Sequence, residues 1–328
     1  MRQLIIHENE AGQRLDKFLQ KYMPAAPVSF FYKMLRKKNI TLNGKKAEGK
    51  EKLSLEDQVT LFLSEETIEG FQNRKPQSAE YEQAYEKLTG ISVVYEDDHV
   101  LIMNKPDNVL TQKAKDGDLS LNEWMIGYLL AKGECSREQL ATFKPSVCNR
   151  LDRNTSGLVI GAKSLRGSQY MNELLRTRQI KKFYRLLVKG CVEKEETLEG
   201  YLVKDEEKNV VQIVPNSYVK GAAYIKTRYY PVRKFKDCTL AEVELITGKS
   251  HQIRIHMSAV GHPVLGDYKY GDRRWNDQYK WQHQIGSQML YASRLEFGKL
   301  EAPFEALSQK VIEAPMPDDF SRLINRQV

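Results

Sequence analysis

The chain has 328 residues, of which 41 % are hydrophobic and 29 % charged, an ordinary composition for a folded protein that excludes wholesale disorder. This length predicts one large domain with a small one. Lysine and arginine outnumber aspartate and glutamate by 51 to 43, and the resulting net charge of +8 suggests a polyanionic partner without requiring one.

The sequence shows no sign of a disulfide framework, a zinc site or a membrane segment. The four cysteines are scattered and form no CxxC pair, so we expect reduced thiols. The N-terminus is polar, and no apolar run approaches the roughly 18 residues that a membrane span needs. We therefore expect a cytoplasmic protein.

Two helices and a hairpin are predicted within residues 1–65. Apolar residues at helical spacing indicate a first helix that ends near Met23, where prolines follow. Ser29 is the expected cap of a second helix. Asn43 and Gly44 then predict a tight hairpin turn, because both residue types tolerate a positive φ.

The second helix and the hairpin carry a dense group of basic side chains. Between Ser29 and Lys52, eight basic residues stand against two acidic ones, a local charge of +6. The simplest interpretation of such a run is a solvated surface. Six of these side chains lie on the helix and the hairpin turn: Lys33, Arg36, Lys37, Lys38, Lys45 and Lys46.

Residues 66–90 are predicted to be a linker, because the sequence turns polar there. From Ile91 to residue 328 we expect a larger domain, with helices that begin at Ser120 and near Ser168. Strands are predicted at residues 100–103, 158–162, 183–188, 210–214, 224–230 and 240–246. Because several strands are joined by short turns, we predict an α+β fold with a mixed, mainly antiparallel sheet.

One loop carries a carboxylate between two arginines. Residues 148–163 read CNRLDRNTSGLVIGAK, which places Asp152 between Arg150 and Arg153 just before an apolar strand. On residue types alone, Asp152 would be a turn residue or a surface partner of a neighbouring arginine.

The whole run resembles the catalytic motif HRLDxxTSGLLLxAK of the RluA-type RNA pseudouridine synthases, with Asn149 in place of the common histidine. Further blocks resemble that family in the same order. They are residues 95–106, 181–188, 247–267 and 290–297, where Tyr291 replaces a frequent histidine. The N-terminal helices and hairpin resemble an S4 RNA-binding domain.

This resemblance implies an enzyme that converts uridine in RNA to pseudouridine, with large-subunit ribosomal RNA as the expected substrate and transfer RNA as the alternative. Asp152 would be the catalytic carboxylate, acting by covalent attack or by proton abstraction through a glycal; the sequence leaves both open. Arg254, on a helix predicted between Ser250 and Gly261, would keep Asp152 ionised. Tyr184 would stack on the target base and is a candidate acceptor of the C5 proton.

The resemblance also implies RNA contacts. Arg150 would fill the gap left by the flipped nucleotide, and Arg153 is a weaker candidate. The six basic side chains of the N-terminal region become candidate RNA contacts that supply affinity and salt dependence. His251 and His256 are not spaced as in a helical zinc motif, so we expect no metal and no cofactor.

Two other functions are alternatives. One is a non-catalytic S4-containing RNA-binding or ribosome-assembly factor that retains the synthase fold. The other is a glycoside or nucleoside hydrolase, which would usually need a second working carboxylate that the matched blocks do not offer. We expect a monomeric enzyme.

Overall fold

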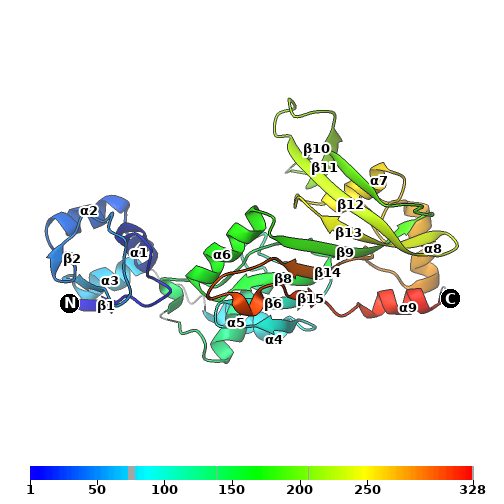
Figure 1. Cartoon of the computed structure of the whole chain (residues 1–328). Helices are drawn as coiled ribbons and strands as arrows, with labels where there is room; N and C mark the ends of the chain where they lie inside the picture. The colour runs from blue at the N-terminus through cyan, green and yellow to red at the C-terminus, as the bar shows by residue number, and fades with distance from the viewer. Residues whose placement is uncertain (73–77, 138, 206, 327–328) are drawn as a thin grey trace.

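The computed structural model describes residues 1–72, 78–137, 139–205 and 207–326. A small N-terminal unit with its own sheet is joined to a larger body built on one long sheet (Figure 1). The two parts touch directly: Glu10 accepts a hydrogen bond from the Thr142 hydroxyl (2.6 Å), and the Asn9 side chain accepts one from the Leu165 amide (3.2 Å).

The N-terminal unit packs helices on a four-stranded sheet of order β1-β4-β2-β3. Its elements are β1 (Arg2–Ile5), α1 (Leu15–Tyr22), α2 (Val28–Arg36), β2 (Ile40–Leu42), β3 (Lys45–Lys46), β4 (Gln58–Leu61) and α3 (Glu65–Gln72). Fully buried apolar side chains such as Phe31 and Ile40 form its core. The predicted hairpin turn is confirmed, with φ of 51° at Asn43 and 71° at Gly44.

The start of α2 differs from the prediction. Pro27, with φ −66° and ψ 146°, is the N-cap, so Ser29 lies inside the first turn and not at the cap. Proline has its φ already restricted to this value, and it suits a helix start because the first amides have no partner within the helix. The predicted end of α1 at Met23 is confirmed.

The segment predicted as a linker is helical in most of its described part, and only residues 88–90 there lie outside a helix; residues 73–77 lie outside the described part. Helix α3 places the fully buried Ile68 in the core of the N-terminal unit. Helix α4 (Ser78–Lys87) packs on the body, where the carbonyl of Tyr81 lies so close to Gly127 that any side chain there would clash. Each helix buries few residues, so its sequence remains polar.

The body is built on an 11-stranded sheet with the main order β11-β10-β12-β13-β9-β14-β8-β6-β5. Its strands are β5 (Ser92–Glu96), β6 (Val100–Lys105), β7 (Ser146–Val147), β8 (Ser156–Ala162), β9 (Ile180–Lys189), β10 (Glu196–Asp205), β11 (Val210–Val214), β12 (Ala223–Lys234), β13 (Cys238–Leu245), β14 (Leu290–Phe297) and β15 (Val311–Glu313). Among the described residues, β8 and β14 are the one pair of parallel strands. The predicted α+β fold with a mainly antiparallel sheet is confirmed.

Helices flank this sheet. Besides α4, they are α5 (Leu121–Ala131), α6 (Leu165–Arg176), α7 (Gln252–Ala259), α8 (Arg273–His283) and α9 (Asp318–Arg326), with single 3₁₀ turns at Gln139–Ala141 and Glu305–Leu307. Ser120 is the N-cap of α5, as predicted. Helix α6 begins earlier than predicted, because the Ser164 hydroxyl and not Ser168 accepts the capping hydrogen bond from the Gly167 amide (2.9 Å).

One end of the long sheet projects as an arm. Strands β10, β11 and the adjoining part of β12 rise from the body at the upper right of Figure 1, on the side where α2 lies in the N-terminal unit. Across the described residues, no helix is long and apolar enough to span a membrane.

Candidate active site

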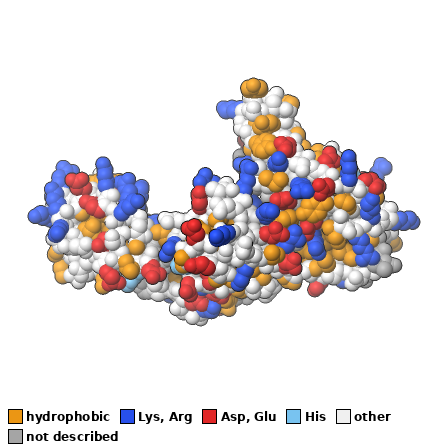
Figure 2. Space-filling model, viewed as in Figure 1, with side chains coloured by type: hydrophobic (Ala, Val, Ile, Leu, Met, Phe, Trp, Pro, Cys, Tyr) orange, Lys and Arg blue, Asp and Glu red, His pale blue; other side chains and the backbone are white. Residues whose placement is uncertain are grey.

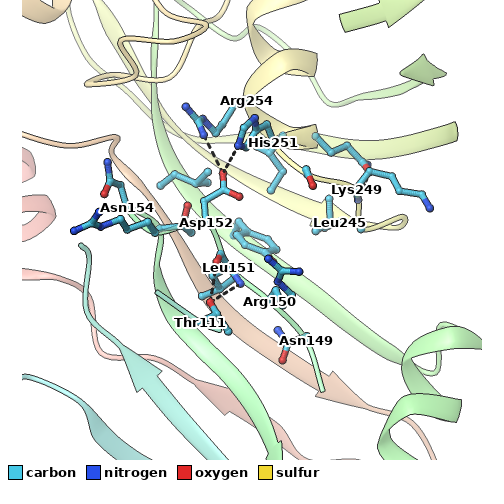
Figure 3. A pocket seen from close by; sticks show the side chains of 18 of the residues that line it. Thr111, Asn149, Arg150, Leu151, Asp152, Asn154, Leu245, Lys249, His251 and Arg254 are labelled. Atoms are coloured by element: carbon cyan, nitrogen blue, oxygen red, sulfur yellow. Dashed lines mark hydrogen bonds and ion pairs between the residues drawn. The ribbon is translucent and has the colours of Figure 1, made fainter. Parts of the chain in front are cut away.

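A cleft of about 1470 Å³ lies over the middle of the long sheet. Five of the residues singled out in the sequence line it: Arg150, Asp152, Arg153, Tyr184 and Arg254. They come from the loop before β8, from strand β9 and from helix α7, and Figure 3 shows the Asp152 carboxylate pointing toward Arg254 and His251. Folding therefore brings the three predicted catalytic residues to one cavity.

The loop that presents Asp152 is held from both sides. The Thr111 hydroxyl donates to the Leu151 carbonyl (2.8 Å) and accepts from the Leu151 amide (3.1 Å). The buried ammonium of Lys105 donates to the carbonyl of Arg153 (3.0 Å), and also to the carbonyls of Pro106 and Val109 (2.8 Å each). These bonds fix the backbone on each side of Asp152.

Two further residues of the motif at residues 148–163 stabilise the local structure. The Asn149 side chain accepts a hydrogen bond from the Ile160 amide on β8 (2.7 Å), so the residue that replaces the common histidine ties the loop to the strand. Gly157 has φ 107°, and a Cβ there would lie 2.2 Å from the Ala292 carbonyl oxygen. Only glycine allows β8 and β14 to approach so closely in this conformation.

Asp152 and Asp267 share one guanidinium. Arg254 donates from Nη1 to Asp152 (3.0 Å), and from Nε and Nη2 to the two carboxylate oxygens of Asp267 (2.7 and 2.8 Å). Burial raises the pKa of Asp267, but the hydrogen bonds and charge of Arg254, together with the backbone amides of Lys269 and Tyr270, outweigh it and hold this pKa below its ordinary value. The bidentate pair fixes the guanidinium plane, and its remaining edge faces Asp152.

Helix α7 carries Arg254 and differs at its start from the prediction. Its N-cap is His251, in the left-handed region with φ 54°, and not Ser250. The His251 ring contacts the Tyr270 hydroxyl through Nδ1 (2.8 Å), while its Nε2 lies 4.0 Å from Asp152. Burial lowers the pKa of His251, so a neutral imidazole faces the carboxylate at neutral pH.

His256 lies in a different environment. It is buried, its Nδ1 contacts the Thr227 hydroxyl (2.8 Å), and burial lowers its pKa to about 4. The structure separates the two histidines, and within the described ranges no group of three or more His, Cys, Asp or Glu side chains is placed to hold a metal ion.

Tyr184 lies on β9 and is 6 % exposed at the floor of the cleft. Its neighbours across the sheet are Val243 on β13 and Ala292 on β14. Burial raises the pKa of Tyr184, and the negative charge of Asp152 adds to this rise. The phenol is therefore neutral at physiological pH.

The predicted RNA contacts fall into two separate places. Arg150 and Arg153 are exposed at the cleft, and Arg153 also donates to the Asn108 carbonyl (3.4 Å). The six basic side chains of α2, β3 and the residues that follow α2 are all exposed, but none of them lines the cleft. In Figure 2, basic side chains crowd the upper edge of the N-terminal unit.

Sequence reasoning did not assign functions to Asp267, Lys105 or Thr111. Asp267 and Lys105 stand inside blocks that resemble the family, and that resemblance was the signal that could have found them. Thr111 lies outside those blocks, and its sequence neighbourhood offers no signal for its contact with Leu151.

Comparison with known proteins shows the family of the chain. Residues 99–259 match the family described as RNA pseudouridylate synthase, and residues 13–59 match the S4 domain. A curated relative from Vibrio cholerae, ribosomal large subunit pseudouridine synthase C, is 34 % identical over 92 % of this chain and 92 % of its own. This chain belongs to the RNA pseudouridine synthase family. The predicted RluA-type resemblance, the S4 domain and the enzyme class are confirmed.

Other relatives cover the chain as fully. The Vibrio vulnificus protein of the same name is 30 % identical over 97 % of this chain and 94 % of its own. An uncharacterized RNA pseudouridine synthase of Mycoplasma capricolum is 32 % identical over 98 % of this chain and 100 % of its own. The solved structure of human RNA pseudouridylate synthase domain containing 4 has 21 % identity and a TM-score of 0.59, over 76 % of this chain and 97 % of that one, which shows a shared fold.

Proposed function

We propose that this protein isomerises uridines of large-subunit ribosomal RNA to pseudouridine, with Asp152 as the catalytic carboxylate. Family membership supports the reaction, and the names of the Vibrio relatives support the substrate. The observation that carries the role of Asp152 is its contact with Arg254 Nη1 (3.0 Å) inside the cleft. This charge-assisted hydrogen bond fixes the position of the carboxylate within the cleft.

The reaction breaks the bond between ribose C1′ and uracil N1, turns the base, joins C1′ to C5 and removes the C5 proton. Asp152 acts at the sugar, either by attacking C1′ or by taking a ribose proton on the glycal route. Both routes require a charged and oriented carboxylate. Arg254 provides this orientation, because Asp267 holds its guanidinium in place.

Tyr184 is assigned to the target base. A neutral, rigidly held phenol suits stacking, and stacking on an aromatic ring contributes about 1–3 kcal/mol per base. A role as acceptor of the C5 proton requires that the phenolic proton leaves first. Arg150, exposed at the cleft, is assigned to the gap that the flipped nucleotide leaves in the RNA.

The N-terminal unit is assigned to general RNA binding. Residues 1–65 form its RNA-binding part, residues 91–328 form the catalytic domain, and residues 66–90 join them. Figure 2 shows the surface hollowed between the N-terminal unit and the arm of β10–β12, which leaves room for a folded RNA across both parts. The protein acts as a monomer in the cytoplasm.

A tritium-release assay tests the proposal. Large-subunit ribosomal RNA with tritium at uridine C5 is incubated with wild type, Asp152→Asn and the control Asp98→Asn, an exposed residue outside the cleft. Wild type and the control should release tritium, while Asp152→Asn should bind the RNA and release none. A wild type that binds but releases none would instead fit the non-catalytic factor, and a fully active Asp152→Asn would remove Asp152 from the mechanism.

A further inference from the structure

Two basic side chains at one end of the cleft have no carboxylate beside them. Lys182 and Arg178 both line the cleft, and within the described residues neither side chain forms a hydrogen bond or an ion pair. Two other cations that line the cleft are paired with carboxylates: Lys113 with Glu80 (2.6 Å) and Arg176 with Glu173 (2.5 Å). The end of the cleft near Lys182 therefore carries uncompensated positive charge.

Lys182 is fixed relative to the proposed base site. It precedes Tyr184 by two residues on β9, so both side chains leave the same face of the strand, roughly 7 Å apart. The ammonium lies against Gly248, where an added Cβ would be 3.4 Å from Nζ. Nζ is therefore held between β9 and the loop before α7, within the reach of a single nucleotide whose base lies on Tyr184.

The electrostatics of this place favour an anion. Burial lowers the pKa of Lys182, and the nearby charge of Arg178 lowers it further. Taking an ammonium out of water without a counter-charge is unfavourable, and an anion that arrives between the two cations removes that cost. The backbone of Arg178, just after α6, is in the left-handed region (φ 61°), a conformation in which glycine is the usual residue.

We propose that Lys182 and Arg178 form a phosphate site that binds the RNA backbone next to the target uridine and sets the nucleotide in register with Asp152. The backbone phosphate is the RNA group that presents the required charge at this distance from a base. The site rests on the proposed function, since the base position on Tyr184 sets the geometry.

Methylphosphonate substitution tests the site, because it removes the charge of one chosen phosphate. Fragments of large-subunit ribosomal RNA that wild type converts are prepared with one methylphosphonate at each position around the target uridine. The enzymes compared are wild type, Lys182→Met and Lys181→Met. Lys181 is the matched control, since it is the adjacent lysine of β9 but is exposed and does not line the cleft.

At one position, the methylphosphonate should raise the KM of wild type and of Lys181→Met roughly tenfold to a hundredfold, as expected for one lost charged hydrogen bond. Lys182→Met should already have the raised KM on unmodified RNA and show no further rise at that position. The salt dependence of RNA binding by Lys182→Met should correspond to about one phosphate contact fewer than that of wild type. Lys182→Arg should recover most of the loss, because it keeps the charge.

The outcomes separate the two proposals. A wild type that converts no uridine would contradict the proposed function. A wild type that converts uridine, with no position at which Lys182→Met abolishes the methylphosphonate effect, would overturn the phosphate site alone. Should Lys182→Met lose its native tryptophan fluorescence, the exposed Arg178→Met replaces it and must show the same position dependence; its failure to do so also overturns the site.

Discussion

Replacement of Arg254 by methionine should destabilise the body of the protein, because Arg254 is the cation that neutralises a buried carboxylate. The Asp267 side chain is 1 % exposed, and it would retain only the backbone amides of Lys269 (2.9 Å) and Tyr270 (3.2 Å) as donors. Removing one partner of a buried ion pair costs about 3–5 kcal/mol. Since two backbone donors remain, we expect a loss at the lower end, about 3 kcal/mol.

Urea unfolding followed by tryptophan fluorescence measures this loss in the body alone. All three tryptophans lie there: Trp124, Trp275 and Trp281. The control is Arg274→Met, an exposed arginine on α8 whose replacement should change the free energy of unfolding by less than about 0.5 kcal/mol. The double variant Arg254→Met/Asp267→Asn should recover most of the stability, because no unpaired buried charge remains.

The same substitution should lower kcat by roughly a hundredfold or more, because Asp152 loses a preorganised charge partner. Two results would refute the reasoning. If the free energy of unfolding of Arg254→Met is lower than that of wild type by under about 1 kcal/mol, Arg254 does not hold Asp267. The same conclusion follows if the double variant is as unstable as the single one. If kcat is unchanged, Arg254 does not orient Asp152.

Three further predictions follow from particular residues. Tyr184→Phe should keep the fold and the RNA affinity but lower the rate of tritium release, while Tyr184→Ala should also raise KM; equal KM values for the two variants would contradict a stacking role. Because burial lowers the pKa of His256 from 6.5 to about 4, its contribution to stability is complete above pH 6.5 and is lost as pH falls toward 4. Wild type should therefore lose up to about 3 kcal/mol more than His256→Gln between pH 7 and 4 in urea unfolding, and parallel losses would exclude His256 as the cause. Neutralising Lys37, Lys45 and Lys46 together should weaken RNA binding and flatten its salt dependence, as measured by filter binding. Neutralising Lys194 and Lys299 should do neither. Equal salt dependence of the two variants would argue against RNA binding by the N-terminal surface.

Short-range features of this protein could be predicted from its sequence. The Asn43-Gly44 turn, the end of α1 at Met23 and six of the body strands (β6, β8, β9, β11, β12 and β13) follow from local backbone preferences and apolar periodicity. The order of the motifs identified the family and the candidates Asp152, Tyr184 and Arg254, which folding brings into one cleft. These properties depend on residues close together in the chain, or on a pattern shared with relatives.

Tertiary structure decided which charges are buried and which are paired. Asp152 and Arg254 are 102 residues apart, and no local pattern states that Arg254 also binds Asp267 or that Lys105 holds the Asp152 loop. Helices α3 and α4 were missed for the same reason, since the few apolar side chains they bury meet partners on distant segments. Burial and ion pairing depend on which distant segments meet, and local backbone preferences carry no information about that.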